Sequence, residues 1–497
     1  MHPVFATTFL LGLVFIIQIC TAIHVLLTKH EEAVSATLWL LIIFTFPLGI
    51  GIVLYLLFGI NRIKTLGLKI ALANELIHAQ EKSHVHEVFD KLIAERNKFI
   101  YQDYATSQDP LEYNKTIDNL LPETLPLTGN KLELLRDGTA AYPQMLAAIK
   151  TAQHNIHLQS FIIHKDAIGK EILDALEQKA RQGVKVKVLY DKFGSLKAVY
   201  SHFFKHYSNK IPNLEMVPFA FINILALWRV QLRNHRKLLV VDGKIAFVGG
   251  INISSNNDIR VCNKDKYIHD LHCKLQGPAI VPLQLSFLRD WHYATKIAPN
   301  EIFQAAHFPT TQKCGNAIMR IIDSGPGQKD NATEKMFFAA AATAKKSLWI
   351  MTPYFTPDQA YIKSLQMAAA RGVEVRIIMP KRNNHWYAQF ASRSLYNSLL
   401  NHGIRIFEKT GRFSHTKAVL LDHKWAYMGS SNCDVRSFRL NYELDFTAND
   451  DEFIDALYEQ FINAMDKSEE ISSAMVLKKK LPRQLLENLC SLLTPIL

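Results

Sequence analysis

The chain has 497 residues, of which 48% are hydrophobic, so it is long enough for more than one folded domain and its composition excludes a disordered protein. Its six cysteines include no CxxC pair, which argues against a disulfide framework or a structural zinc site and favours a reducing compartment. The formal net charge of +12 indicates a partner that carries phosphate, either nucleic acid or an anionic lipid surface, and charge alone does not separate the two.

The N-terminus contains two long apolar segments. Residues 6–27 and 35–60 contain no Asp, Glu, Lys or Arg, and each is long enough to cross a hydrocarbon layer of about 30 Å. We expect residues 1–60 to form a two-helix transmembrane hairpin, because no basic region precedes the first segment as it would in a signal peptide. A cleaved signal peptide and a hairpin buried in a soluble protein remain the alternatives.

Basic residues follow the second apolar segment directly. Arg62, Lys64 and Lys69 lie there, whereas the loop between the segments has Lys29 against two glutamates. Because basic residues are concentrated on the cytoplasmic side of membrane proteins, we expect the large remaining part of the chain to be cytoplasmic. The N-terminus therefore favours a lipid surface over nucleic acid as the phosphate-bearing partner.

The rest of the chain is read as a connector and two similar halves. We expect residues 61–125 to be a helical connector, since KIALANELIHAQEKSHVHEVFDKLIAER has helical spacing and no proline or glycine. Residues 126–310 contain a strand, a helix, a glycine and a strand in NIHLQSFII, KEILDALEQKARQG and VKVKVLYD. Residues 311–470 repeat this order in SLWIMTPYF, YIKSLQMAAARG and VEVRIIMP. The repeat predicts duplicated α/β domains with a mostly parallel central sheet.

Each half contains the same spaced set of polar residues. NHRKLLVVDGKIAFVGGINIS begins at Asn234, and SHTKAVLLDHKWAYMGSSNCD begins at Ser414. Both have a histidine, a lysine two residues later and an aspartate five beyond that, a combination expected by chance only about 0.06 times in such a chain. The matching residues are His235, Lys237, Asp242, Gly249 and Asn252 in the first half and His415, Lys417, Asp422, Gly429 and Asn432 in the second.

The apolar pattern around the motif predicts its local geometry. The run RKLLVVDGKIAFVGG is interrupted at Asp242, which predicts two strands joined by a tight turn. His235 and Lys237 are expected on one strand and on one face of it, because they are two residues apart. His415 and Lys417 are expected in the same arrangement. Each motif aspartate is then either a structural turn residue or a member of the site.

Two copies of the motif suit a reaction with two displacements. Phosphodiester exchange through a covalent intermediate needs one nucleophile and one group that first donates and then accepts a proton. Two histidines facing each other across a pseudo-twofold axis would fill these roles, while lysines and asparagines would surround the phosphate oxygens on which charge grows. The chain contains no HExxH, no GxxxxGK[ST] and no acid-rich metal cluster, so we expect no metal and no other cofactor.

The repeated HxKxxxxD resembles the signature of the phospholipase D superfamily. NHRKLLVVDGKIAFVGGINI, FLRDWHYAT, TPYFTPD and VRSFRLNYE, with the apolar LWLLIIFTFPLGIGIVLYLLFG, are similar to blocks of its bacterial cardiolipin synthase family. The resemblance covers nearly the whole chain. It implies duplicated phospholipase D-like α/β domains with pseudo-twofold symmetry, a multi-pass protein of the bacterial cytoplasmic membrane, and phosphatidyl transfer between two phosphatidylglycerol molecules giving cardiolipin and glycerol.

The resemblance also implies roles for individual residues. One histidine attacks phosphorus to form a phosphohistidine while the other protonates the departing glycerol, and our hypothesis assigns the attack to His235 and the proton transfer to His415. Asp270 and Glu443 match the carboxylates that orient the histidines in this family. The catalytic candidates are His235, Lys237, Asp242, His415, Lys417 and Asp422, and the substrate-binding candidates are Gly250, Asn252, Ser430, Asn432, Asp270 and Glu443.

Three other functions stay open at this point. A phospholipase D hydrolase would use water as the acceptor with the same residues, and a related transferase would take another donor or acceptor lipid. The segments SFIIH and IHD depart from the family pattern beside the expected lipid site, which leaves lipid preference open. A membrane-tethered nuclease would use the basic surface for phosphate contacts. Nucleic acid is not the partner we expect, because no basic-aromatic stacking motif occurs.

The C-terminal residues 471–497 combine basic and apolar side chains. Lys478, Lys479, Lys480 and Arg483 lie beside leucines at helical spacing. We expect a basic amphipathic helix on anionic phospholipids, where each basic residue contributes about 1 kcal/mol. A helix packed on the soluble domain is the alternative, and the oligomeric state is not readable from the sequence.

Overall fold

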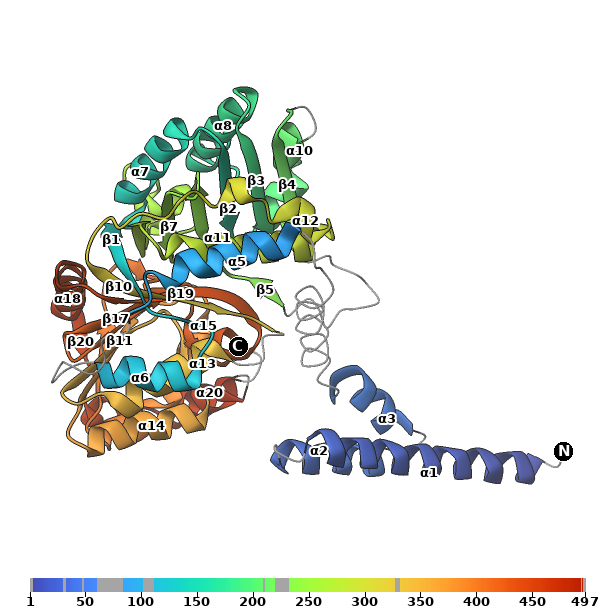
Figure 1. Cartoon of the computed structure of the whole chain (residues 1–497). Helices are drawn as coiled ribbons and strands as arrows, with labels where there is room; N and C mark the ends of the chain where they lie inside the picture. Colours follow the sequence, from blue (N-terminus) through green and yellow to red (C-terminus); the bar gives the residue numbers. More distant parts are fainter. Residues whose placement is uncertain are drawn as a thin grey trace. The chain divides into compact units, whose positions relative to one another are not determined.

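The computed structural model divides the chain into two compact units, residues 1–69 and 70–497 (Figure 1). Helices α5 (His84–Asn97) and α6 (Leu111–Leu120) occur within the expected connector. The rest of that segment is only partly described. The described residues are 3–29, 33–46, 49–59, 84–101, 111–208, 211–219, 232–326, 331–492 and 494.

The N-terminal unit consists of α1 (Pro3–Thr28), α2 (Ala33–Thr45), α3 (Ile50–Leu54) and the π-helix η2 (Tyr55–Gly59). The second expected span is therefore not one helix, because α2 ends before Pro47, which has no N–H to continue it, and a left-handed Gly49 precedes α3. In the described part of the chain, no helix combines the length and the apolar character needed to cross a membrane. The predicted transmembrane hairpin is thus not shown.

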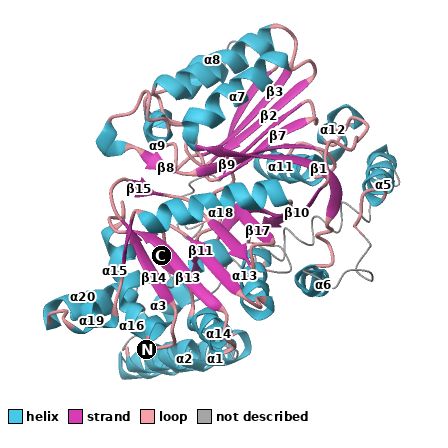
Figure 2. Cartoon of the chain, turned by 90° about the vertical axis from the view of Figure 1, so that its left-hand side faces the viewer, coloured by secondary structure: helices cyan, strands magenta, loops and turns pink. Residues whose placement is uncertain are grey.

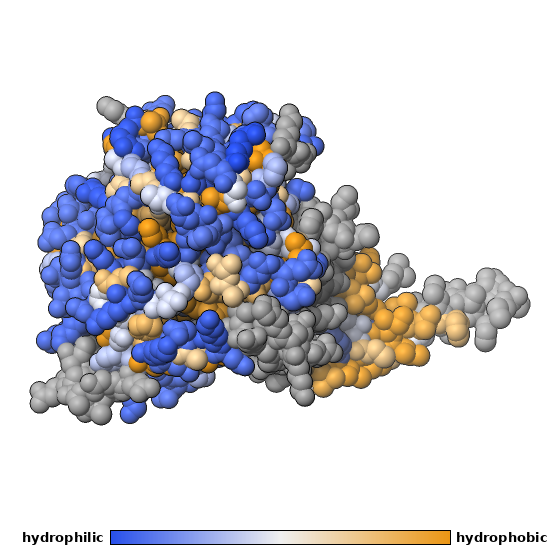
Figure 3. Space-filling model, turned by 45° about the horizontal axis from the view of Figure 1, so that its top comes forward, coloured by the Kyte–Doolittle hydropathy of each residue, from blue (hydrophilic) through white to orange (hydrophobic). Residues whose placement is uncertain are grey.

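The helices of the N-terminal unit pack on one another through a small apolar cluster. Val25, Ile43 and Tyr55 are buried in it, Gln18 Nε2 donates to the Ile43 carbonyl at 2.8 Å, and His24 Nδ1 lies 2.9 Å from the Tyr55 hydroxyl. Most other apolar side chains of α1 and α2 stay exposed, and Figure 3 shows this surface in orange. The unit therefore presents more apolar surface than a soluble domain of its size normally does.

The large unit is built from two halves with matching element order. The first half contains β1 (Leu127–Arg136), α7 (Asp137–Thr151), β2 (Asn155–Ser160), α8 (Ala167–Arg181), β3 (Lys185–Asp191), α9 (Leu196–Tyr200), α10 (Phe203–Ser208), β4 (Leu214–Phe219), β5 (Arg233–Asn234), β6 (Leu238–Val241), β7 (Ile245–Gly249), β8 (Ile268–His269), β9 (Leu271–Gln276), α11 (Ile280–Thr295) and α12 (Pro299–Ile302).

The second half repeats the pattern. It contains β10 (Ala317–Ser324), α13 (Ala332–Thr343), β11 (Ser347–Met351), β12 (Phe355–Thr356), α14 (Gln359–Ala370), β13 (Glu374–Pro380), α15 (Trp386–Ser394), α16 (Tyr396–Leu400), β14 (Arg405–Lys409), β15 (Phe413–Ser414), β16 (Ala418–Leu421), β17 (Trp425–Gly429), β18 (Cys433–Asp434), α17 (Val435–Arg439), β19 (Asn441–Asn449), α18 (Asp451–Asp466), β20 (Ser468–Glu470), α19 (Ser473–Leu477) and α20 (Leu481–Ser491).

Equivalent helices of the halves begin and end in the same way. Asp166 caps α8 by accepting from the Gly169 amide, and Asp358 caps α14 by accepting from the Tyr361 amide. Soon after each helix the chain reverses at a glycine with positive φ, Gly183 or Gly372, at the point where the sequence has its helix-glycine-strand repeat. The duplicated α/β fold that the repeat predicts is confirmed.

The strand order of the long sheet is symmetric about the β1–β10 junction. The long sheet runs β4-β3-β2-β6-β7-β9-β1-β10-β19-β17-β16-β11-β13-β14-β20, so that each strand from β4 to β1 has its counterpart at the same distance beyond the β1–β10 junction. This order is the topological form of a pseudo-twofold relation between the halves. Along this strand order, parallel pairing is limited to β2–β3 and β3–β4 in the first half and to β11–β13 and β13–β14 in the second. The central strands β6, β7, β9 and β1 pair antiparallel. The prediction of a mostly parallel sheet is therefore wrong.

Helices cover both faces of the sheet, which explains the continuous apolar runs in its central strands. Leu239 and Val241 of β6 pack in the cluster under α7 and α8, while Leu238 and Val240 pack on the other face under α11 (Figure 2). In the second half, α13 and α14 cover one face and α18 covers the other. Because β6 and β16 are buried on both sides, the residues just before them are held in a rigid frame.

Candidate active site

Short strands that pair across the halves position both motif histidines. β5 pairs in parallel with the start of β19, and β15 pairs in parallel with β8. The next residue in each case is a histidine whose amide donates to the other half, His235 to the Tyr442 carbonyl at 2.9 Å and His415 to the His269 carbonyl at 2.7 Å. Because β6 and β16 begin three residues later, the histidines and lysines lie between strands, and their predicted location on a strand is wrong.

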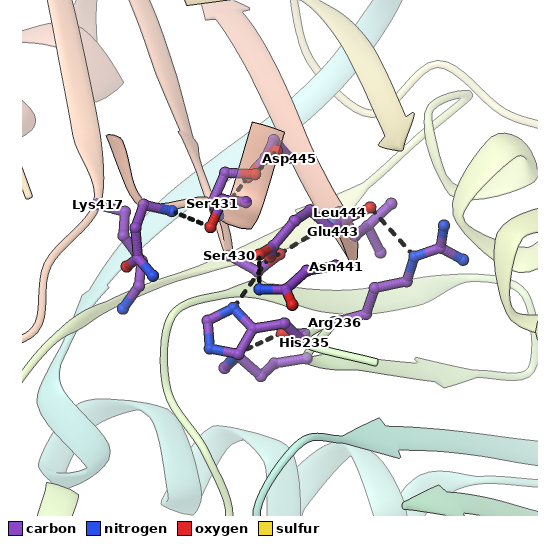
Figure 4. Close-up of polar contacts among 12 residues, drawn as sticks. His235, Arg236, Lys417, Ser430, Ser431, Asn441, Glu443, Leu444 and Asp445 are labelled. Atoms are coloured by element: carbon purple, nitrogen blue, oxygen red, sulfur yellow. Dashed lines mark hydrogen bonds and ion pairs between the residues drawn. The ribbon is translucent and has the colours of Figure 1, made fainter. Parts of the chain in front are cut away.

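Each histidine contacts a carboxylate of the opposite half. His235 Nδ1 lies 3.0 Å from Glu443 Oε2, and His415 Nδ1 lies 2.9 Å from Asp270 Oδ2. Figure 4 shows His235 directed at Glu443 on β19. All four side chains are nearly or wholly buried. Since a carboxylate engages Nδ1 in both rings, Nε2 is the ring nitrogen that faces a substrate, and Lys417 Nζ lies 3.3 Å from Nε2 of His415.

The two motif lysines lie beside the histidines. The ammonium groups of Lys237 and Lys417 each donate to the carbonyl of the histidine two residues earlier. Lys417 Nζ also lies 2.6 Å from His415 Nδ1 and 3.4 Å from Asp270 Oδ2. The structure thus brings two histidines, two lysines and two carboxylates, all named from the sequence, into one buried cluster.

Burial and the lysine charges keep both histidines neutral near pH 7. Burial, then the charges of Lys237 and Lys417, hold the pKa of His235 well below its usual range. Burial and then the Lys417 charge lower the pKa of His415 to about 3. Burial and then the Lys417 charge also lower the pKa of Lys237 to about 7. This excess of positive charge in a buried site favours an anionic ligand, whose charge would raise these pKa values again.

The two carboxylates differ in their ionisation. Burial raises the pKa of Asp270, but the charge of Lys417 and the hydrogen bond from His415 outweigh it and bring the pKa to about 2. Burial raises the pKa of Glu443 above its usual value, although Lys237 and a hydrogen bond from Ser430 oppose the effect. Asp270 is therefore the more firmly ionised of the pair, so that His415 has the stronger partner for a protonated ring.

Gly250 and Ser430 occupy equivalent positions behind the carboxylates. A Cβ atom at Gly250 would lie 2.2 Å from Asp270 Oδ1, so this carboxylate packs directly on the glycine. Ser430 Oγ donates to Glu443 Oε2 at 2.5 Å, and Asn441 Nδ2 donates to its Oε1 at 3.0 Å. Gly250 therefore packs on the Asp270 carboxylate, and Ser430 donates a hydrogen bond to the Glu443 carboxylate. The predicted part of both residues in substrate binding stays a prediction.

The two motif asparagines are buried near the cluster. Asn252 Oδ1 accepts from the Ile162 amide at 3.1 Å, and the Tyr142 hydroxyl donates to the Asn252 carbonyl at 2.6 Å. Both oxygens of Asn252 are therefore engaged by the protein. Asn432 Oδ1 is buried and has no hydrogen-bond partner among the described residues, a state that is costly unless a ligand or water completes it.

Asp242 and Asp422 lie at the other end of their strands and have a structural role. Each follows β6 or β16 in a tight turn with positive φ, 50° and 52°. The Asp242 carboxylate accepts the backbone amides of residues 153–155, which lead into β2, and Asp422 accepts those of residues 345–347, which lead into β11. These contacts agree with the turn-residue alternative, and the catalytic assignment of both aspartates stays a prediction.

Sequence reasoning missed the residue between the motif histidine and lysine. Arg236 is buried, its Nε donates to the Glu443 carbonyl at 3.1 Å, and its guanidinium forms ion pairs with Asp290 and Asp323. It therefore ties the first half to β19 and β10 of the second. The sequence did contain a signal for this residue. The second motif has Thr416 where the first has Arg236, and an arginine between two buried strands needs acidic partners.

Two aromatic rings also escaped the sequence reading. Phe161 meets the His235 ring edge-on, with centroids 5.0 Å apart, and Tyr354 meets the His415 ring at 6.1 Å. Both follow equivalent strands, β2 and β11, in the segments SFIIH and TPYF.

Among the residues that the structure describes, no group of His, Cys, Asp and Glu side chains is arranged to hold a metal ion.

Comparison with known proteins agrees with this geometry. The family model described as "Cardiolipin synthase, PLD-like domain" matches residues 145–268 and 338–465, and "Phospholipase_D-nuclease N-terminal" matches residues 16–59. A solved phosphatidylserine synthase from Haemophilus influenzae Rd KW20 superposes with a TM-score of 0.59 over 78% of this chain and 100% of that chain, at 17% identity, which supports the fold alone. The duplicated halves are therefore phospholipase D-like domains.

Curated relatives narrow the family. A cardiolipin synthase from Alkalihalophilus pseudofirmus is 30% identical over 98% of this chain and 94% of its own length. Cardiolipin synthase 2 from Bacillus anthracis is 34% identical over 95% of this chain and 89% of its own. Because these matches extend over nearly the full length of both partners, the chain belongs to the cardiolipin synthase family with phospholipase D-like domains.

Proposed function

We propose that this protein transfers a phosphatidyl group from one phosphatidylglycerol molecule to another, giving cardiolipin and glycerol. The observation that carries the proposal is the crossed pairing of His235 with Glu443 and of His415 with Asp270 around two buried lysines. This arrangement supplies two oriented imidazoles and a positive environment for one phosphodiester. The full-length similarity to cardiolipin synthases supports the choice of lipids.

In the first displacement, His235 is the nucleophile. Its Nε2 lone pair forms a bond to the phosphorus of the donor lipid, and the bond from phosphorus to the glycerol oxygen breaks. His415 Nε2, protonated once the phosphate charge offsets the lysines, gives its proton to that oxygen, so that neutral glycerol leaves. Lys237 and Lys417 stabilise the negative charge on the phosphoryl oxygens. The products are a phosphatidyl-histidine and free glycerol.

In the second displacement, His415 acts as the base. It takes the proton from a glycerol hydroxyl of the second phosphatidylglycerol, whose oxygen attacks phosphorus while the bond to His235 Nε2 breaks. Cardiolipin forms and both histidines return to their initial protonation states. The firmly ionised Asp270 suits His415 to the proton-carrying role, because a nearby carboxylate stabilises the imidazolium form.

Two other activities use the same groups. Hydrolysis would follow if water took the place of the second lipid, and a related transferase would take another alcohol or donor headgroup. A nuclease is not favoured, because the relatives over the full length are lipid enzymes. Product analysis separates the first two from cardiolipin synthesis.

We also propose that the protein works at the bacterial cytoplasmic membrane. The N-terminal unit exposes large apolar side chains, among them Phe9, Leu26 and Val34. At the other end of the chain, α20 packs on α15 with its polar Glu487 buried, while Leu481, Leu485 and Leu489 are each at least 60% exposed. A helix with its leucines outward and with exposed Lys478, Lys480 and Arg483 nearby suits an anionic lipid surface.

The test supplies purified protein with labelled phosphatidylglycerol in mixed micelles, with EDTA, and separates the lipid products. We expect cardiolipin and glycerol from the wild type and neither from His235→Ala or His415→Ala. If His235 is the nucleophile, His415→Ala can still form the phosphatidyl-histidine and accumulates labelled protein, whereas His235→Ala cannot. Phosphatidic acid as the sole product would make the enzyme a hydrolase, and the absence of any lipid turnover would reject the lipid function.

A further inference from the structure

A basic cavity of about 600 Å³ lies between the two halves of the large unit, outside the histidine cluster. The first half contributes the β1–α7 junction and β8, and the second contributes the loop after β14 and the end of α18. Its charged and aromatic lining residues are Arg136, Asp137, Tyr267, Lys409, Arg412 and Lys467.

Positive charge in this cavity exceeds negative charge. Asp137 is its one lining carboxylate, and that group is already engaged, since its Oδ1 lies 2.6 Å from His269 Nδ1 and its Oδ2 lies 3.9 Å from Arg136 Nε. In the described chain, no carboxylate lies within ion-pair distance of the ammonium groups of Lys409 or Lys467. Burial and then the charge of Lys467 lower the pKa of Lys409, although the charge of Asp137 opposes the effect.

The cavity adjoins the side of the active site that contains His415. His269, which lines it, accepts the His415 amide through its carbonyl at 2.7 Å. Asp137 Oδ1 accepts the amide of Asp270, the residue that orients His415, at 3.0 Å. Arg412 directly precedes β15 and His415 directly follows it, so three residues and at most about 10 Å of extended chain separate them. Long basic side chains and a glycerol bridge can span that distance.

A lipid acceptor needs a second phosphate site. The histidines and lysines of the cluster hold the phosphate that reacts, but an acceptor phosphatidylglycerol brings another phosphate, which does not react and stays charged. Burying that charge beside the first without basic partners would be strongly unfavourable. Water and free glycerol, the alternative acceptors, carry no such group.

We propose that this cavity binds the non-reacting phosphate of the acceptor phospholipid through Arg412, Lys467 and Lys409, and so presents the acceptor hydroxyl to His415. The proposal rests on the proposed function and deepens it. The cavity makes the site selective for an alcohol attached to a phosphate, and its place beside His415 agrees with the assignment of that histidine as the base.

The experiment compares two acceptors in the full-length enzyme. Cardiolipin formation uses the phosphate-bearing acceptor, whereas exchange of labelled glycerol into phosphatidylglycerol uses the same intermediate with a neutral acceptor. For Arg412→Gln and Lys467→Gln, we expect cardiolipin formation to fall about tenfold or more and glycerol exchange to stay within about twofold. Lys170→Gln, which removes an exposed charge from α8, is the control for general attraction to anionic micelles and should change neither rate.

Four results would overturn the proposal. Equal losses of both activities in the two variants would place these residues in general catalysis or folding, and unchanged cardiolipin formation would exclude the cavity from acceptor binding. Submillimolar inhibition of glycerol exchange by inorganic phosphate, abolished in Lys467→Gln, would assign the cavity to the free ion, because an acceptor site would let phosphate compete only with cardiolipin formation. If the wild type exchanged glycerol but made no cardiolipin, the proposed function would fail and not only the role of the cavity.

Discussion

The imidazole of His235 in the first half is oriented by Glu443 in the second half, with 3.0 Å between Nδ1 and Oε2. The reverse contact, from His415 to Asp270, has nearly the same length. Each half therefore supplies the carboxylate that orients the histidine of the other half. This contact adds to the strand pairing that fixes the two main chains. A half expressed alone would have a histidine without its carboxylate, so the duplicated domain is one catalytic unit.

The first prediction concerns Glu443→Gln. The change keeps the shape of the side chain but removes the charge that fixes the His235 tautomer and stabilises its positively charged intermediate. We expect kcat for cardiolipin formation to fall about a hundredfold or more, with little change in KM for the lipid. Steady-state kinetics at varied surface concentration measure both.

Ser430→Ala is the companion variant for this prediction. It removes the hydroxyl that donates to Glu443 but leaves the carboxylate and its contact with His235. The loss of activity should therefore be much smaller than for Glu443→Gln. If the two variants lose the same activity, or if Glu443→Gln loses none, the carboxylate does not orient the histidine.

The second prediction concerns Gly250→Ala. The added Cβ would lie 2.2 Å from Asp270 Oδ1, so the carboxylate must move and His415 moves with it. We expect at least a tenfold loss of kcat, because small displacements of a catalytic group are costly, while circular dichroism stays that of the wild type. Position 430 already carries a Cβ in the equivalent place, so Ser430→Ala is the matched control. Full activity in Gly250→Ala would show that the close packing has no catalytic importance.

The third prediction separates a structural role from a catalytic one at Asp242. Its carboxylate accepts three backbone amides ahead of β2, and an asparagine there would lose the charge and put an N–H against those donors. We expect Asp242→Asn to lower the free energy of unfolding by about 1–3 kcal/mol, measured by denaturant unfolding in detergent. Activity per folded molecule should stay within a few-fold of the wild type, and a hundredfold loss in a stable variant would support the catalytic assignment instead.

The sequence predicts the duplication and the centre of the site well, because both depend on local spacing. His235, Lys237, His415 and Lys417 meet in one cluster as expected, and the helix-glycine-strand repeats form equivalent elements. Strand direction was predicted only at the tight turn of Asp242, and the direction of the other central strands could not be read. The hairpin after Asp242 returns the chain antiparallel in the middle of the sheet, and an apolar run reads alike in either direction.

Contacts between the halves could be predicted only through the family resemblance. Nothing local to Glu443 indicates that it faces His235, which lies 208 residues away. The buried position of Arg236 and the basic cavity depend likewise on how the two halves dock. These features arise from tertiary packing, so the spacing of residues along the sequence does not predict them.

The fourth prediction concerns acid stability. Burial, and then the charge of Lys187, lower the pKa of His307 to about 4, whereas in the unfolded chain it is about 6.5. Between these values the unfolded state binds a proton that the folded state does not. The stability is therefore fully present above pH 6.5 and falls as the pH drops toward 4, by about 2 kcal/mol at pH 5 from this residue.

The pH prediction is checked by unfolding at pH 7 and pH 5. His307→Gln should lose less stability between the two values than the wild type does, whatever its stability at pH 7. His206→Gln, at an exposed position in α10, is the control and should keep the wild-type difference. An unchanged pH difference in His307→Gln would mean that this residue is protonated in the folded state as well.

The last prediction concerns the outward leucines of α20. Leu485 and Leu489 are 60% and 62% exposed, although burial of a leucine is normally favourable by about 1.5–3 kcal/mol. A lipid surface would recover that energy, so Leu485→Asp should weaken binding of the full-length protein to phosphatidylglycerol-rich vesicles about tenfold in a flotation assay. Met367→Asp, on the equally exposed surface of α14, is the matched control and should bind as the wild type does. If both variants bound equally well, membrane association would depend on the N-terminal unit. The role of α20 would then be limited to packing within the large unit.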